Sequence, residues 1–548
     1  MRLHTSLILI VCGTSALSAC NKPVEPLWAG PNAIVSGAVQ QSAIAALGRG
    51  TAVSLWSTLL PEEEADSDQT NLDTYTQTRY RVFARLAIYA SDFRTLGTGD
   101  QGWATPQPLQ TSARIAVRRE DRDNATGAVT RVYATQDATL VAQPRLATDA
   151  SGHAFAVWQQ KDLYVNAQGI TRLVSHVYFA LFSSDTLQWS SPTILDQNNT
   201  SQGVGSLHAN EPLDAYDPDL SVNPSGDALV VWRQLSDVSG PSQIMARRYR
   251  PDVGWPLAAQ KISTAGVGHD ADMPRVRLAN DNSGIGYAIW RQHQATVHNA
   301  DTYNRFVVYA AKYTGTAWTN ITQLSDGLVD AVEPTLAVNT NNRAAVAWAQ
   351  LDYTFNVSDI QVAPSATTKP PYVYSVYANR YNGTAWLANA EEIDGANVTA
   401  RSVDIALDGN DNLYAVWLRE ITPASDQWNN DRVIQVYRRE FIGNTWTTPN
   451  TLDGETRFDT DTPHIIAHGN TLLTYWKRWR DPLFGNGFEM LAQRYRNGAW
   501  GDIHALGMSD EDAFGATAAI SADGTAYVAW ISVDRPGNSA LLVSAATP

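Results

Sequence analysis

Residues 273–290 read MPRVRLANDNSGIGYAIW, and this stretch decides the fold of the 548-residue chain. MPRVRLA predicts one strand, NDNSG a tight turn and IGYAIW a second strand, because short alternating runs separated by Gly and Asn are strand and hairpin signals. Residues 305–324, RFVVYAAKYTGTAWTNITQL, predict a third strand, a turn and a fourth strand. The segment therefore predicts one small sheet of four antiparallel strands.

The same segment recurs along the chain and is marked by tryptophans. Sixteen of the 18 tryptophans fall on a grid with a period of roughly 50 to 70 residues, which indicates a propeller or an array. One set closes runs such as small-x-Ala-Val-Trp: Trp56, Trp158, Trp232, Trp290, Trp348, Trp417, Trp476 and Trp530. The other set follows a tight turn: Trp28, Trp103, Trp189, Trp255, Trp318, Trp386, Trp446 and Trp500.

Eight repeats of four strands predict an all-β, eight-bladed β-propeller. The last repeat has three strands, 517–520, 526–530 and 540–545, whereas residues 27–37 resemble an isolated fourth strand. Pairing that N-terminal strand with the C-terminal three would close the ring and remove exposed sheet edges. A ring of seven or nine blades is the alternative. Closure places Trp28 at the lower face and the loops between blades at the upper face.

Bulk composition narrows the class of protein. Hydrophobic residues make up 44% of the chain and charged residues 17%, which suits a large core and excludes wholesale disorder. The formal net charge of -15 excludes nucleic acid as an expected partner, because phosphate binding needs a basic face. We expect a monomer, since one closed ring absorbs the whole length.

The N-terminus predicts export. Arg2, the apolar run 7–12 and the tetrapeptide Leu17-Ser18-Ala19-Cys20 resemble a bacterial lipoprotein signal, with 1–19 as signal peptide, 20–27 as tether and 28–548 as one propeller domain. An ordinary secretory signal with a stray cysteine is the alternative. Cys20 is then the predicted site of acylation. Asn21 favours the outer membrane, periplasmic or surface-exposed, by resemblance to lipoprotein sorting rules. An extra hairpin is predicted at about 113–135.

Charged residues recur where the blades begin. One set follows an Asp-Ala-x-x-Pro pattern or a variant of it, and a basic set lies just after the first tryptophan of several blades. Two interpretations stand: a binding funnel for a charged glycan or peptide, or aspartates that cap strands and pair with neighbouring arginines. The candidates are Asp214, Asp270, Asp330, Asp459 and Asp512, with Arg233, Arg291, Arg419 and Arg478.

Other candidate sites carry weaker signals. Trp428 and Trp479 lie off the grid in upper loops, where an aromatic ring stacks on a sugar, anchors a partner or packs locally. A further group could bind a metal or hold a general base, or it is a coincidence on a polar loop. Its members are His208, Glu211, Asp214, His269, Asp270 and Asp272. Residues 408–412, DGNDN, suggest calcium but have Leu413 where a calcium loop needs Gly, which favours a simple turn. We expect no cofactor beyond the lipid on Cys20.

The tryptophan strand and the R-Y-x-G-x-x-W turn resemble the repeats of uncharacterised bacterial lipoproteins. More distantly they are similar to sialidase-type propellers, whose turn is S-x-D-x-G-x-x-W. Gly383 and Trp386 match that turn, but Tyr381 stands at its Asp position. That resemblance implies a fold only. An eight-bladed lipoprotein of the outer-membrane barrel-assembly machinery shares the architecture but not the repeat motif A-x-D-x-x-T-G-x-x-x-W.

Three functions remain open at this level. The first is a lipid-anchored binding or scaffold module that recognises envelope protein or glycan through its upper face. The absence of G-x-S-x-G, H-E-x-x-H and P-loop motifs favours it over catalysis. The second is a sialidase-like glycan hydrolase or lyase that uses rim carboxylates. The third is a multivalent lectin with equivalent sites between blades.

Overall fold

A computed structural model of the chain shows eight antiparallel sheets among the residues that it describes. These are residues 28–547 apart from 30–31, 37–38, 49–50, 63–66, 71–75, 97–99, 112–114, 124–125, 127–128, 135–140, 167–168, 170, 197–210, 238–239, 256–257, 265–269, 299–300, 320, 328, 352–373, 396–398, 422–432, 453, 455–458, 480–486, 508–511 and 535–538. The predicted signal peptide and tether, with Cys20 and Asn21, therefore lie outside the described residues.

The sheets are blades 1 to 8, named by their innermost strands in chain order. The innermost strands are β2 (Val39–Gly48), β10 (Val141–Thr148), β15 (Ala215–Val222), β19 (Ala271–Leu278), β23 (Ala331–Val338), β27 (Ala400–Leu407), β32 (Thr460–His468) and β36 (Asp512–Ile520). The second strands are β3 (Thr51–Glu62), β11 (Ala154–Val165), β16 (Ala228–Leu235), β20 (Gly286–His298), β24 (Ala344–Leu351), β28 (Leu413–Ile421), β33 (Thr471–Trp479) and β37 (Ala526–Val533).

The outer strands complete each blade. The third strands are β5 (Thr76–Leu96), β12 (Thr171–Ser183), β17 (Ser242–Tyr249), β21 (Asp301–Tyr313), β25 (Tyr374–Tyr381), β29 (Val433–Ile442), β34 (Phe488–Arg496) and β38 (Ser539–Ala546). The outermost pieces are β1 (Asn32–Ser36), β6 (Asp100–Trp103), β7 (Gln107–Thr111), β13 (Gln188–Trp189), β14 (Thr193–Ile194), β18 (Gln260–Lys261), β22 (Thr322–Gln323), β26 (Glu391–Glu392), β30 (Thr445–Trp446), β31 (Asn450–Thr451) and β35 (Ala499–Ala505).

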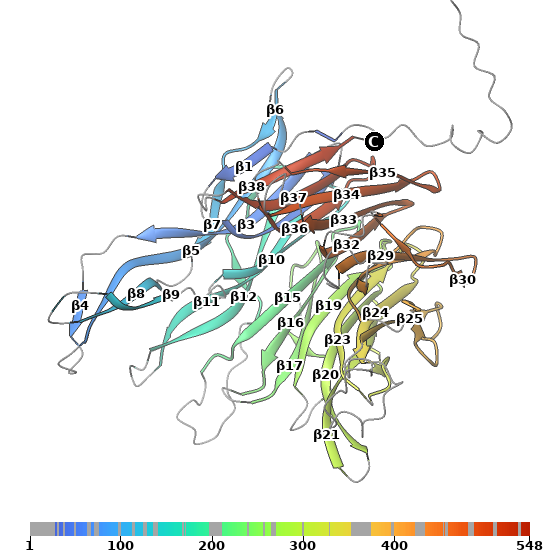
Figure 1. Ribbon diagram of the computed structural model, residues 1–548, viewed down its shortest axis with the longest axis horizontal. Helices are drawn as coiled ribbons and strands as arrows, with labels where there is room; N and C mark the ends of the chain where they lie inside the picture. Colours follow the sequence, from blue (N-terminus) through green and yellow to red (C-terminus); the bar gives the residue numbers. More distant parts are fainter. Residues whose placement is uncertain are drawn as a thin grey trace, which may run out of the picture.

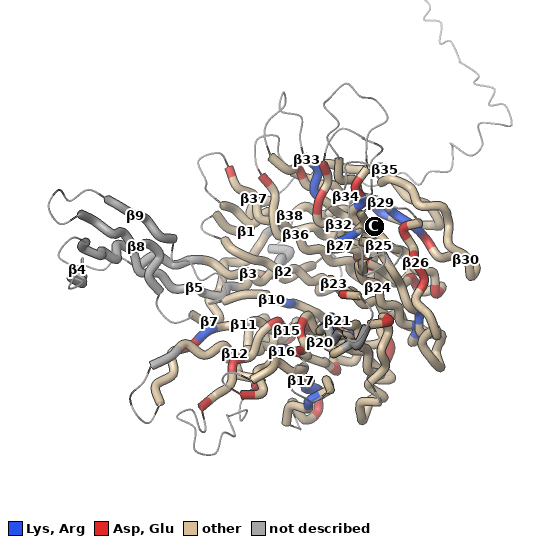
Figure 2. The backbone as a smooth tube through the Cα atoms, turned by 60° about the horizontal axis from the view of Figure 1, so that its bottom comes forward, with Lys and Arg blue, Asp and Glu red and all other residues tan. Residues whose placement is uncertain are grey.

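The ring is closed, and the predicted eight-bladed propeller is confirmed. Each innermost strand contacts the innermost strand of the next blade, from β2 through β36 and back to β2. Figure 2 shows β2, β10, β15, β23, β27, β32 and β36 grouped at the centre, with β12, β17, β26 and β30 around them. The upper face is the face at which the innermost strands begin.

The N-terminal strand completes the last blade, as the sequence predicts. Blade 8 has the order β1-β38-β37-β36, and β1 lies beside β38 in Figure 1. Asn32 pairs with Val543, and Trp28 forms a bridge with Ala546 at the lower end of β38. The Ser544 hydroxyl donates to the Ala29 carbonyl at 2.6 Å. The edge of β38 is therefore covered by residues from the other end of the chain.

Blade 1 differs from the others because its third strand, β5, is much longer. The upper part of β5 pairs with β4 (Ser67–Thr70) and with β8 (Ile115–Asp123), and β8 pairs in turn with β9 (Val129–Ala134). These strands extend away from the ring in Figure 1. Among the described residues there is no helix long and apolar enough to cross a membrane.

Tryptophans of the first set form the core of every blade. All eight are at most 1% exposed. A buried tryptophan removes roughly 200 Å² from water, which corresponds to about 5 kcal/mol at about 25 cal/mol per Å². In four blades the glutamine two residues later accepts the indole N–H at 2.9 to 3.3 Å: Trp158–Gln160, Trp232–Gln234, Trp290–Gln292 and Trp348–Gln350.

Candidate functional site

The innermost strands share a β-bulge near the upper face. Gln143, Asp217, Met273 and Glu333 each have φ between 50 and 54°, and each precedes a proline. A positive φ is costly for a residue with a side chain, and such residues persist only where the surrounding structure fixes them. The ladder slips at these points, as between Asp272 and Arg275. The bulge therefore lies directly before the residue that follows the proline on the inner strand.

Blades 2, 3 and 4 bring a charged cluster together after these prolines. Asp219 lies at its centre: its Oδ2 accepts Arg277 Nη1 at 2.8 Å, and its Oδ1 lies 3.6 Å from Arg145 Nε. The Val276 amide of the next blade also donates to Asp219 Oδ2 at 2.8 Å. The Asp219 side chain is 4% exposed, whereas those of Arg145 and Arg277 keep 36% and 41%. The cluster is therefore anchored at the carboxylate and open at the guanidiniums.

The electrostatics of this arginine cluster (Arg145, Arg275 and Arg277) follow from its geometry. Burial would raise the pKa of Asp219, but Arg277, Arg275 and Arg145 together lower it below its ordinary value. Burial lowers the pKa of Arg145, and Arg275 and Arg277 lower it further. Asp219 is therefore ionised at neutral pH. Arg145 is repelled by the charges of Arg275 and Arg277, and the single carboxylate of Asp219 does not cancel that repulsion.

Positive charge remains in excess around Asp219. Arg275 donates to its own Pro274 carbonyl at 2.9 Å and, among the described residues, makes no ion pair. Asp217 is the second carboxylate nearby, and it accepts Gln143 Nε2 at 2.6 Å. Three guanidiniums thus face two carboxylates, in a chain whose formal net charge is -15. Such an excess favours a bound anion.

The other side of the ring is balanced differently. Asp404 of blade 6 accepts Thr335 Oγ1 at 2.8 Å and the Ile465 amide at 3.1 Å, and it lies 3.3 Å from His464 Nδ1. Burial would raise the pKa of Asp404, but these partners, His464 first, lower it. Here one carboxylate is met by one histidine and three neutral donors, the third being the Ile405 amide at 3.0 Å. The cluster of three arginines belongs to blades 2 to 4.

The five predicted rim aspartates all make one kind of contact. Each carboxylate accepts a backbone N–H from the third strand of the preceding blade at 2.7 to 2.8 Å. The pairs are Ser175–Asp214, Ser242–Asp270, Phe306–Asp330, Ile434–Asp459 and Phe488–Asp512. This contact, the blade clasp, joins neighbouring sheets and matches the capping interpretation of these residues.

The four predicted rim arginines lie on two faces of their sheets. Arg233 and Arg291 directly follow the core tryptophan, whereas Arg419 and Arg478 come two residues after it, and side chains alternate along a strand. Arg291 pairs with Asp272 at 2.6 and 2.9 Å, and Arg478 with Glu489 at 2.8 Å. Arg233 lies over the Tyr216 ring and Arg419 over the Tyr437 ring. They therefore do not form one ring that faces the aspartates.

The remaining candidates are placed separately. Trp479 ends β33 and packs edge-on against Phe488 at 5.1 Å. Glu211 accepts Asn166 Nδ2 at 2.9 Å, and Asp408 Oδ1 accepts the amides of Asn410 and Asn412, which is a turn. The described residues contain no group of three metal-binding side chains. His208, His269 and Trp428 lie outside the described residues.

The arginine cluster was missed at the level of sequence, although a signal for it exists. The Asp-Ala-x-x-Pro pattern marks the start of a blade. The residue after its proline lies on the innermost strand, at the position of the charged cluster. That position holds Arg145, Asp219 and Arg275 in three consecutive blades. The predicted rim residue is the aspartate that begins this pattern, whereas the residues of the charged cluster directly follow the proline that ends it.

The sequence matches no known protein family and no curated relative. Its structure has distant similarity to other propellers. An ulvan lyase from a new polysaccharide lyase family has a TM-score of 0.38 and 11% identity, over 88% of this chain and 96% of that chain. A leech intramolecular trans-sialidase has 0.34 and 9%, over 95% and 98%. A Dyadobacter fermentans protein of unknown function has 0.37 and 12%, over 62% and 96%. Likeness at this level does not extend to activity or substrate.

Proposed function

We propose that this propeller is a binding module for an acidic glycan, which it holds through the arginine cluster of blades 2 to 4. The observation that carries the proposal is Arg275, a guanidinium on the innermost ring that has no ion-pair partner among the described residues. Guanidinium groups bind carboxylate and sulfate groups through paired N–H donors. Asp219 positions Arg145 and Arg277 beside it.

Two alternatives receive less support from the site. A glycan hydrolase needs a pair of carboxylates about 5 to 10 Å apart that face a substrate. Each of the five rim aspartates instead accepts a backbone amide of the preceding blade, as Asp214 does from Ser175. A multivalent lectin needs equivalent sites in every blade, but the cationic excess lies in blades 2 to 4, and blade 6 has Asp404 in place of an arginine.

The test is binding of the protein from Asn21 onward to polygalacturonate, with neutral dextran and polyglutamate as comparisons. We expect saturable, salt-sensitive binding to polygalacturonate only, because exposed charge pairs weaken as salt rises. Arg275→Gln should weaken binding about tenfold or more, as loss of a charged hydrogen bond does. Arg401→Gln is the matched control, because Arg401 is an exposed arginine on the innermost strand of blade 6.

The binding test can contradict either the site or the proposed ligand. Equal losses in the two variants would contradict the site, and equal binding to dextran would contradict recognition of charge. Preference for polyglutamate would replace the glycan by an acidic peptide.

We also propose that Cys20 carries the lipid that tethers this module to the outer membrane. The support is the Leu17–Cys20 tetrapeptide and the entry of the chain at the lower face, where Trp28 meets Ala546. The tether would then leave the upper face pointing away from the bilayer. Incorporation of labelled palmitate into the wild-type chain but not into Cys20→Ser tests this proposal, and label in both would contradict it.

A further inference from the structure

Several seams between two blades repeat one aromatic arrangement in their outer part, near the lower face. A residue at or next to the end of the third strand and the turn tryptophan of one blade pack on an aromatic residue of the preceding blade, three positions before its core tryptophan. At the seam of blades 4 and 5, Tyr381 and Trp386 pack on Tyr287 with ring centroids 5.3 and 6.1 Å away. Tyr414 and Phe155 occupy the same place at two other seams.

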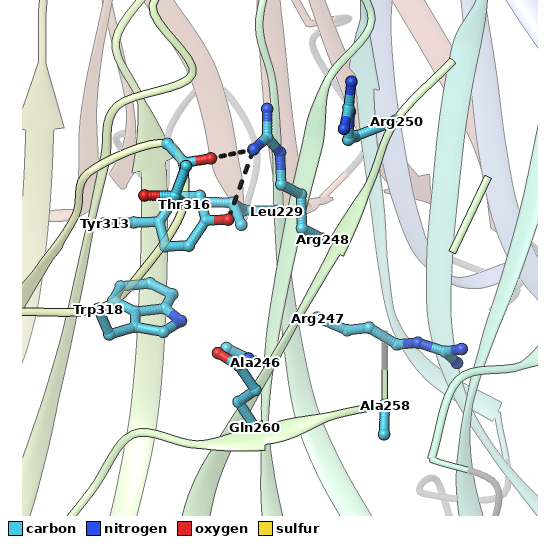
Figure 3. A pocket seen from close by; sticks show the side chains of 11 residues that line it. Leu229, Ala246, Arg247, Arg248, Arg250, Ala258, Gln260, Tyr313, Thr316 and Trp318 are labelled. Carbon is cyan, nitrogen blue, oxygen red and sulfur yellow. Dashed lines mark hydrogen bonds between the residues drawn. The ribbon is translucent and has the colours of Figure 1, made fainter. Parts of the chain in front are cut away.

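The seam of blades 3 and 4 lacks the ring from the preceding blade, as does the seam of blades 5 and 6, where Ala345 stands at that position. Leu229 stands where Phe155 and Tyr287 stand elsewhere, so no ring from blade 3 fills the space in front of Tyr313 and Trp318. A pocket of about 330 Å³ lies there. Leu229 and Ala246 line its apolar side, and Figure 3 shows Trp318, Gln260 and Arg248 around it. The pocket is thus a seam with one aromatic ring missing.

At the seam of blades 5 and 6, a carboxylate lies beside the turn tryptophan and the arginine. Glu391 accepts the Trp446 indole N–H at 3.2 Å and pairs with Arg380 at 3.0 and 3.1 Å. Arg380 then lies over the Phe441 ring, with its Cζ 3.7 Å from the ring centroid. One carboxylate therefore satisfies the turn tryptophan and fixes the arginine that covers the seam.

In blade 3 the position of Glu391 is taken by a neutral residue. Gln260 pairs with Ala246 as Glu391 pairs with Ala378, so the two residues share one register position. Arg248, the counterpart of Arg380, turns instead to Asp227 at 2.7 Å and to the Gly315 carbonyl.

The sequence also explains why the Arg248 side chain points to Asp227. Asp227 lies five residues before its core tryptophan, and the counterpart in blade 5 is Arg343, which repels a guanidinium. Among the described residues, neither the Trp318 indole N–H nor the Gln260 carboxamide has a protein hydrogen-bond partner. In Figure 3 the indole nitrogen and the carboxamide face the same space.

We propose that this seam pocket binds a small organic carboxylate built on a ring. The carboxylate takes the place that Glu391 holds at the other seam: it accepts N–H groups from Trp318 and Gln260, in a pocket whose lining also includes the cations Arg247, Arg248 and Arg250. The ring lies over Leu229, where Phe155 or Tyr287 supplies a ring elsewhere. This site is separate from the arginine cluster, because it lies between the outer strands β17 and β21, whereas the cluster lies on the innermost strands.

The test uses benzoate as probe and benzamide as its neutral counterpart, with isothermal titration of the protein from Asn21 onward. Benzoate should bind at one site and benzamide at least about tenfold more weakly, because a charged acceptor strengthens the hydrogen bonds. Gln260→Glu should abolish benzoate binding, since it supplies the carboxylate internally. Leu229→Phe should abolish it by filling the ring space. Circular dichroism and the melting temperature check that both variants fold.

A reciprocal variant serves as the matched control. Glu391→Gln gives the seam of blades 5 and 6 the neutral residue of the pocket seam, but there Arg380 lies on Phe441 and Ala345 forms the floor. This variant should leave benzoate binding at the pocket unchanged. No benzoate binding to the folded wild type, equal binding of benzamide, or retained binding in folded Gln260→Glu would each overturn the proposal.

Discussion

The Asp270 carboxylate accepts the Ser242 backbone amide at 2.7 Å, and this bond joins blade 4 to blade 3. The Asp270 carbonyl accepts the His293 amide within blade 4 at 2.8 Å, so one residue is fixed to two sheets. The Ser242 hydroxyl adds bonds to Asp270 at 3.1 Å and to the Ala271 carbonyl at 2.9 Å. Repetition of this blade clasp at five seams gives these aspartates a structural reason to recur.

Asp270→Ala should lower the free energy of unfolding by roughly 1 to 3 kcal/mol, because it leaves the Ser242 amide without its acceptor. Urea unfolding followed by tryptophan fluorescence measures the change. Asp252→Ala is the control, since Asp252 is exposed and, among the described residues, pairs only with Arg250. A surface change of this kind is expected within about 0.5 kcal/mol. Equal effects of the two substitutions would show that the clasp adds no stability.

Stability should depend on pH through Asp394, which is fully buried. Burial, and next the charge of Glu392, raise the pKa of Asp394 from 3.8 to about 7. Between these values the folded protein holds a proton that the unfolded chain has released, so stability falls as pH rises through this window and stays low above it. Asp394→Asn should therefore raise stability at pH 8 by up to about 4 kcal/mol, at about 1.4 kcal/mol per pKa unit, and change it little near pH 4.

A carboxylate at the matching position of blade 2 provides the control for Asp394. Asp196 accepts the Val177 amide at 2.9 Å and lies 2.9 Å from His176 Nδ1. Asp196→Asn should therefore destabilise the protein at pH 8, the opposite sign to Asp394→Asn. A stabilisation by Asp394→Asn that is equal at pH 4 and pH 8 would rule out titration of this group as the cause.

The core tryptophans make a third prediction. Gln234 is fully buried and accepts the Trp232 indole N–H at 2.9 Å. Gln234→Leu keeps the volume but leaves that N–H without an acceptor, and we expect a loss of about 1 to 3 kcal/mol. Gln188→Leu is the control, because Gln188 is an exposed glutamine on the outermost strand of blade 2. A loss as large as that of Gln234→Leu would contradict the assigned role of the glutamine.

Much of this architecture is readable from the sequence because it rests on local repetition. Each tryptophan pattern reports on its own blade, and the unmatched strand at each end predicts closure. The arginine cluster depends instead on Arg145, Asp219 and Arg275, which lie far apart in sequence and come together only because the inner strands of blades 2, 3 and 4 lie side by side around the ring. The seam pocket depends on the substitution of a leucine at one of several equivalent positions, and its consequence appears only when the seams are compared in space.

Closure of the ring can be tested by removing its last strand. A protein that begins at residue 38 lacks β1 and exposes the β38 edge, including the partners of Asn32 and Trp28. An uncovered edge pairs with other chains, so we expect aggregation and a lower melting temperature. A synthetic peptide of residues 27–37 should restore both solubility and stability, because β1 pairs with β38 through backbone bonds and packs Trp28 against blade 8. A scrambled peptide of the same composition is the control. Rescue by the scrambled peptide, or full stability without any peptide, would mean that the ring does not depend on this strand.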